Sequence, residues 1–203
     1  MKLYGAPMPA PNPRRVRIFL AEKGVALAET PVDMMQREHK SPEHMARNAL
    51  GQVPTLELDD GTTISETVSI CRYLEALHPS PPLFGATPLE QAQTDMWIRR
   101  VEFVLMQPVG MYWRHAHPRT ARLIKQYTDF GQSNVERYAE AQAWFNRQLA
   151  GQPFIAGEAF SMADICALST VDFATWIGLP LAQENANLIA WRERVASRPS
   201  ASA

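Results

Sequence analysis

Four consecutive residues, Pro79-Ser80-Pro81-Pro82, divide the 203-residue sequence into two parts with different patterns. Proline lacks a backbone N–H and has a fixed φ angle, so a helix cannot continue through such a run. Strand and helix signals alternate before it, and strand signals almost vanish after it. We therefore expect two domains, residues 1–79 and residues 88–203, joined by a linker over residues 80–87.

The first part predicts the order βαβ, then α, ββ and α. Its second helix begins at Ser41-Pro42-Glu43, where serine suits the cap and proline the first turn. Asp59-Asp60-Gly61-Thr62 is typical of a hairpin turn, and Gly24 of a helix end. The predicted strands cover residues 3–4, 27–32, 53–58 and 63–65, and the predicted helices cover residues 14–23, a short stretch from 41, and 67–77.

The second part predicts an all-helical domain. Phe160-Ser161-Met162-Ala163-Asp164 has the pattern of a capping box, with Asp164 in place of the usual glutamate. Pro108 falls inside the first long helix and should kink it. The predicted helices cover residues 89–112, 132–149, 161–177 and 186–196.

Composition narrows the classes of function. The formal net charge is −1, which favours neither a nucleic-acid nor a membrane-surface partner. No apolar run approaches the roughly 18 residues of a membrane-spanning helix. The two cysteines, Cys71 and Cys166, are far apart, and we interpret them as buried thiols of a protein in the reducing cytoplasm.

Four segments in this order resemble the glutathione transferase superfamily. They are residues 11–17, the loop Gly51-Gln52-Val53-Pro54-Thr55-Leu56, Ser65-Glu66-Thr67, and the box at residues 161–164. The resemblance covers nearly the whole chain. It implies a thioredoxin-like α/β N-terminal domain (βαβαββα) followed by an all-α C-terminal domain. It also implies a homodimer that uses glutathione as co-substrate, requires no metal, and acts on a small hydrophobic electrophile.

Three further strings look like a fungal and bacterial subgroup of that superfamily. They are Glu38-His39-Lys40, the hairpin at residues 56–62, and Gln107-Pro108-Val109. This subgroup lacks the usual catalytic Tyr, Ser or Cys.

The resemblance also implies a set of glutathione-binding residues. Val53 offers its backbone to the cysteinyl amide, and Pro54 supplies a cis turn. Thr67 binds the γ-glutamyl carboxylate at a helix start, and Glu66 takes the ammonium group. Lys40 reaches the glycine carboxylate, with His39 as a competitor, and Gln52 is a weaker candidate at the same end.

The glutathione thiol must be ionised to react, yet residues 6–12 contain no Ser, Thr or Cys. Tyr4 lies in the preceding strand, and we interpret it as core. We expect Asn12 to cap the helix that follows, with Pro13 at its first position, and the helix start to favour a thiolate. Whether Asn12 also donates to the sulfur stays open.

Two histidines of the helical part remain as proton acceptors, His115 and His117. The subgroup also has a histidine at the position of His115, which favours this residue acting through a water. A helix-end histidine with a structural role is the alternative. We expect the electrophile to lie between Met8-Pro9 and a helix face made of Pro108, Met111 and Tyr112.

These features predict a glutathione transferase that conjugates glutathione to hydrophobic electrophiles. A non-catalytic glutathione-binding protein is the main alternative. A glutathione-dependent isomerase, dehalogenase or thiol-transferase on the same scaffold is also open, because fold does not decide among these activities.

Overall fold

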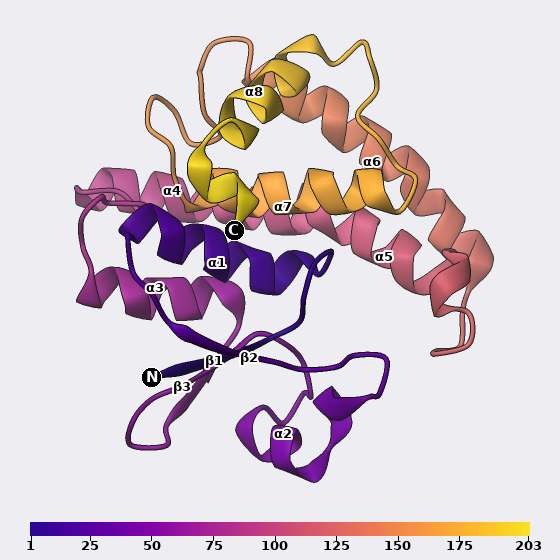
Figure 1. Cartoon of the computed structure of the whole chain (residues 1–203). Helices are drawn as coiled ribbons and strands as arrows, with labels where there is room; N and C mark the ends of the chain where they lie inside the picture. Colours follow the sequence, from indigo (N-terminus) through magenta and orange to yellow (C-terminus); the bar gives the residue numbers. More distant parts are fainter. The chain divides into compact units, whose positions relative to one another are not determined.

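The computed structural model describes all 203 residues, which form two compact units (Figure 1). One unit is Met1–Leu83 together with Pro199–Ala203, and the other is Phe84–Arg198. The five C-terminal residues, which we expected in the helical domain, thus belong to the first unit. A guanidinium N–H of Arg14 donates to the Ala201 carbonyl at 2.9 Å, and the Ser200 hydroxyl donates to the Glu22 carboxylate.

The first unit contains a four-stranded sheet with the order β2-β1-β3-β4. β1 runs parallel to β2 and antiparallel to β3, and β3 and β4 form the predicted hairpin. Leu3 and Leu56 lie opposite each other on β1 and β3 and are almost completely buried. The strands are β1 (Lys2–Gly5), β2 (Ala28–Pro31), β3 (Thr55–Glu57) and β4 (Thr63–Ser65).

Three α-helices complete this unit in the predicted order βαβαββα. α1 (Pro11–Lys23) and α3 (Thr67–Leu77) pack against each other, and α2 (Pro42–Arg47) follows a 3-10 turn at Glu38–Lys40 (Figure 1). α1 ends at Gly24, whose φ of 63° is readily adopted by glycine. Val16, Phe19 and Ile70 bring α1 and α3 into one apolar core.

The second unit is entirely helical. Its central helix, α7 (Met162–Trp176), is apolar on nearly every side and mostly buried, as expected for a helix surrounded by others. The remaining helices are α4 (Pro88–Arg100), a π-helical stretch (Val101–Met106), α5 (Gln107–His115), a short 3-10 turn (Pro118–Thr120), α6 (Thr128–Gln148) and α8 (Ala186–Ala196).

The predicted long helix over residues 89–112 is modified near Pro108. The chain widens into a π-helical stretch directly before α5, and Pro108 stands at the second position of α5. Proline has no N–H to donate to the residue four positions earlier, and its ring crowds that carbonyl. The widened turn accommodates both effects, so the irregularity precedes the proline instead of centring on it.

The predicted capping box at Ser161 and Asp164 is confirmed. The Asp164 carboxylate is fully buried and accepts four hydrogen bonds. The donors are the backbone N–H groups of Ile155 and Ser161, the Ser161 hydroxyl and the Trp191 indole, at 2.8–3.0 Å. One carboxylate therefore joins the start of α7 to α8 and to the preceding loop.

Candidate functional site

One edge of the sheet collects the residues that the sequence singled out in the first unit. Tyr4 lies opposite Thr55, and Thr55 lies opposite Ser65. The ends of β1 and β4 and the beginning of β3 therefore meet at the same edge. The loop that leads into α1, the Val53-Pro54 segment and the start of α3 all extend from it.

Val53 precedes β3 and leaves its backbone unpaired. Its N–H and carbonyl take part in no backbone hydrogen bond, and it belongs to no helix or strand. The predicted cis bond to Pro54 is present. The neighbouring Gln52 carbonyl accepts from His44 Nε2 of α2 at 2.9 Å and from Nδ2 of Asn48, the residue after α2, at 3.0 Å.

The start of α3 is open and its backbone is strained. Glu66 occupies the N-cap position with φ 68° and ψ 120°, and no side chain caps the helix. Positive φ is costly for a residue with a Cβ, and such outliers concentrate at functional sites. The Glu66 side chain is exposed, whereas Thr67 is buried at the first helical position. The start of α3 therefore combines uncapped backbone N–H groups with a hydroxyl, an arrangement typical of anion-binding helix starts.

Lys40 and His39 lie at the other end of this region, beside Gly51. The Lys40 ammonium donates to the Leu50 carbonyl at 2.8 Å. A Cβ on Gly51, which has φ 56°, would lie 2.6 Å from the His39 carbonyl oxygen and 2.8 Å from Lys40 Nζ. The close approach of these two chain segments therefore requires glycine.

Burial lowers the pKa of the His39 imidazole, and the charges of Lys40, His44 and Arg37 lower it further. His39 is therefore neutral at pH 7. Of the two candidates for the glycine carboxylate, Lys40 is the one that brings a positive charge.

Asn12 is not the N-cap of α1, contrary to the prediction. The N-cap position is Ala10, Pro11 is the first helical residue, and Asn12 is the second. The Ala10 N–H already donates to the Pro7 carbonyl, and this turn fixes the start of the helix. The Asn12 side chain has a buried Oδ1 without a hydrogen-bond partner, so its amide is not used for capping.

His115 and His117 differ in their surroundings within the second unit. His115 is the last residue of α5, its ring lies among Tyr127 and Phe130, and its Nδ1 is buried without a partner. His117 Nδ1 instead accepts the Arg119 N–H at the start of a 3-10 turn. Burial, followed by the Arg119 charge, lowers the pKa of His117, which keeps this accepting nitrogen unprotonated.

Models of the glutathione S-transferase N-terminal domain and C-terminal domain match residues 10–77 and 124–199. Glutathione S-transferase 2 of Saccharomyces cerevisiae is 38% identical, over 98% of this chain and 87% of that protein. The chain belongs to the glutathione S-transferase family.

Solved structures of the family agree closely with this transferase. The crystal structure of Gtt2 from Saccharomyces cerevisiae has a TM-score of 0.93 at 37% identity, covering 100% of this chain and 99% of that one. A glutathione S-transferase domain-containing protein of Marinobacter aquaeolei gives 0.92 at 40% identity, covering 98% and 99%. The predicted fold class, a thioredoxin-like α/β unit followed by a helical unit, is confirmed.

The electrophile-binding candidates of the transferase fall in both units. Met8 is exposed and Pro9 half-buried in the loop after β1. Pro108, Met111 and Tyr112 share α5 with His115 at helical spacing. Pro108 is buried, whereas Met111 and Tyr112 are partly exposed.

Three further observations concern the transferase. Tyr4 is buried as predicted, with the Arg47 guanidinium 4.3 Å above its ring. No group of three or more His, Cys, Asp and Glu side chains is arranged to hold a metal ion. No helix combines the length and the apolar character needed to span a bilayer.

Sequence reasoning missed His44 of α2 and Asn48, the residue after α2, which both donate to the Gln52 carbonyl. Both are buried although both are polar.

Proposed function

We propose that the chain conjugates glutathione to small hydrophobic electrophiles. The observation that carries this proposal is the edge of the sheet where an unpaired Val53 backbone lies next to an uncapped helix start. Val53 would pair with the cysteinyl amide groups beside Pro54. Thr67 would bind the γ-glutamyl carboxylate, and the exposed Glu66 would take the ammonium. Lys40, with Gln52 nearby, would bind the glycine carboxylate.

Thiolate stabilisation falls to Asn12 in this proposal. An α-helix start normally offers four N–H groups. In α1, Pro11 and Pro13 have none, and the Ala10 N–H is used by Pro7. The Asn12 backbone N–H remains, together with the side-chain Nδ2 hydrogens, because the Asn12 side chain does not cap the helix. Both would donate to the sulfur and lower its pKa.

His115 is the proposed acceptor of the thiol proton, acting through a water. Its buried and unpartnered Nδ1 supports this role, since a neutral imidazole nitrogen accepts near neutral pH. The test is the pH dependence of turnover in His115→Ala, with His117→Ala as the matched control. We expect His115→Ala to lower turnover strongly, to raise the apparent thiol pKa and to leave glutathione affinity nearly unchanged. An unchanged profile would assign thiol activation to Asn12 alone.

The proposed electrophile-binding residues are Met8, Pro9, Pro108, Met111 and Tyr112. Methionine suits substrates of irregular shape because it is flexible and polarizable. Met111→Ala should change the Michaelis constants of hydrophobic electrophiles and their ranking. If neither changes, the electrophile binds elsewhere.

A glutathione-dependent isomerase is the second candidate function. A maleylacetoacetate isomerase of Pseudomonas aeruginosa is 29% identical over 64% of this chain and 66% of that protein. Conjugation of a chloronitrobenzene with glutathione, measured beside isomerisation of maleylacetoacetate, distinguishes the two activities. Binding to immobilised glutathione without turnover in either assay would instead favour a non-catalytic binding protein.

We also propose a homodimer that works in the cytoplasm. Leu89, Met96 and Phe103 recur every seven residues along α4 and the π-helical stretch, with exposed fractions of 67%, 40% and 64%. Exposed apolar stripes of this kind support an interface between copies. Light scattering should give twice the chain mass at micromolar concentration, and Phe103→Ser should shift the mass towards the monomer. A wild-type monomer would contradict the dimer.

A further inference from the structure

His44 makes one polar ring contact, and that contact is to the backbone next to Val53. The side chain belongs to α2 and is 3% exposed. Its Nε2 lies 2.9 Å from the Gln52 carbonyl oxygen. A carbonyl oxygen only accepts hydrogen bonds, so Nε2 carries the hydrogen. Both the neutral Nε2–H tautomer and the protonated imidazolium satisfy this requirement.

The contact determines which way the next N–H points. The Gln52 carbonyl and the Val53 N–H belong to one planar trans peptide unit, in which they point in opposite directions. Holding the oxygen towards α2 therefore turns the Val53 N–H away from α2. That N–H has no backbone partner.

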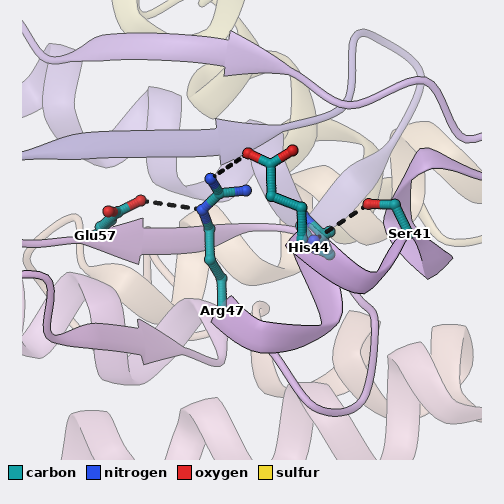
Figure 2. A network of polar contacts seen from close by, with 5 residues as sticks. Ser41, His44, Arg47 and Glu57 are labelled. Carbon is teal, nitrogen blue, oxygen red and sulfur yellow. Dashed lines mark hydrogen bonds and ion pairs between the residues drawn. The ribbon is translucent and has the colours of Figure 1, made fainter.

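Hydrogen bonds and ion pairs hold α2, the helix that contains His44, in place (Figure 2). Ser41 caps α2 by accepting from the His44 N–H at 3.2 Å. Arg47 donates to Glu57 on β3 at 3.1 Å and to Glu43 at 2.6 Å. The Tyr4 ring meets the His44 ring edge-on, with centroids 6.5 Å apart. The imidazole is thus fixed relative to the sheet, as a residue that orients a backbone must be.

We infer that His44 is a positioning residue: it holds the Gln52 carbonyl so that Val53 presents its N–H to the cysteinyl part of glutathione. The inference rests on the proposed function. Asn48 supports the same carbonyl, but it also donates to the Thr55 hydroxyl and accepts from the Leu50 N–H. Because Asn48 therefore helps to hold the loop itself, His44 is the residue whose removal tests orientation alone.

Three variants separate hydrogen bonding from packing. His44→Phe keeps a ring against Tyr4 and removes the donor. His44→Gln keeps an N–H donor at a position similar to Nε2. His78→Phe, at the end of α3, is the matched control for a histidine outside the site. Binding of glutathione is measured by calorimetry, followed by steady-state kinetics and thermal melts.

We expect His44→Phe to weaken glutathione binding by about threefold to tenfold, the range that corresponds to one hydrogen bond. The Michaelis constant for glutathione should rise by the same factor, while kcat and the constant for the electrophile stay within about twofold. His44→Gln should recover most of the affinity, and His78→Phe should behave as wild type. The inference is overturned if His44→Phe binds as wild type does, or if His44→Gln is as weak as His44→Phe.

A measurement on the wild-type protein keeps the inference testable if His44→Phe does not fold. Nitrogen-15 NMR of the imidazole should find Nε2 protonated and slow to exchange with solvent. An unprotonated Nε2 would overturn the inference. A wild-type protein that binds no glutathione overturns the proposed function together with this inference. Equal binding by wild type and His44→Phe overturns this inference alone.

Discussion

The starts of α3 and α7 solve the same problem in opposite ways. Both helices leave backbone N–H groups without intrahelical partners. At α7, the buried Asp164 carboxylate accepts four hydrogen bonds and ties the helix to its surroundings. At α3, Glu66 holds a strained backbone, its side chain is exposed, and no side chain caps the helix.

The start of α7 adds to the stability of the fold, whereas the start of α3 lowers it. A good cap contributes about 1 kcal/mol, and strain such as that at Glu66 costs about 1–3 kcal/mol. α7 is the core of its unit, and a capping box satisfies donors at its start. α3 begins at the edge of the sheet that we propose for glutathione, and no side chain caps its first N–H groups. Each prediction below tests one side of this contrast.

The largest expected effect is on the α7 side. Asp164→Ala removes the acceptor for four donors in a buried position, and unsatisfied buried donors are costly. We expect the free energy of unfolding to fall by about 3–5 kcal/mol. Denaturant unfolding measures this. Ser161→Ala, which keeps the carboxylate and three of its donors, should cost only about 1 kcal/mol; equal losses in both variants would contradict the central role of Asp164.

The pH dependence of stability tests the same carboxyl group. Burial raises the pKa of Asp164 to about 6, and the four hydrogen bonds oppose this rise without cancelling it. A carboxyl whose pKa is higher in the folded state binds protons more tightly there. Its contribution to stability is therefore fully present below pH 4 and is lost as pH rises through about 6.

The rise in the pKa of Asp164 to about 6 corresponds to about 3 kcal/mol of unfolding free energy. Exposed carboxyls titrate in the same range, so the comparison uses Asp164→Asn, which does not titrate. We expect the difference in unfolding free energy between wild type and Asp164→Asn to become less favourable to wild type between pH 4 and pH 7. A difference that grows in favour of wild type would mean that the four donors outweigh burial.

On the α3 side, Glu66→Ala and Thr67→Ala should each weaken glutathione binding. Loss of a charged hydrogen bond costs about 1.5–3 kcal/mol, which corresponds to about tenfold to a hundredfold in affinity. Calorimetry on folded variants measures the change. Unchanged affinity in both variants would remove the γ-glutamyl end of the site from the start of α3.

The smallest expected effect is on the free energy of unfolding at Glu66, where a substitution can separate backbone strain from glutathione binding. Glu66→Gly relieves the positive φ, but it also increases the entropy of the unfolded chain. We expect the free energy of unfolding to stay constant or to rise by about 1 kcal/mol, while glutathione affinity falls. Glu66→Gln keeps the strain and serves as the control. A clear loss of stability in Glu66→Gly would mean that the strained conformation is not costly.

Residues typical of turns and helix ends made much of the fold predictable. α3 and α8 begin and end at the predicted residues, and a proline follows each within three residues, at Pro79 and Pro199. The hairpin and the capping box were predicted for similar reasons. The π-helical stretch before Pro108 was not, because a widened turn and a simple kink satisfy the same local requirement.

The site residues beside the strand ends were predictable from the sequence. Those whose position depends on contacts with other parts of the chain were less so. Asn12 was given the wrong position because Pro11 and Pro13 both suit a helix start, and the Ala10–Pro7 hydrogen bond decides between them. His44 gave no sign of its contact with the Gln52 carbonyl, since that contact depends on how α2 packs beside β3. Such contacts require the three-dimensional structure.

The return of Pro199–Ala203 to the first unit has a consequence for synthesis on the ribosome. Domains generally fold in order as they emerge, yet Arg14 and Glu22 find partners in Ala201 and Ser200. The thioredoxin-like unit therefore emerges early and stays without these contacts until the whole helical unit has been translated. Its final stabilisation therefore follows the synthesis of the helical unit, which couples the completion of one unit to the synthesis of the other.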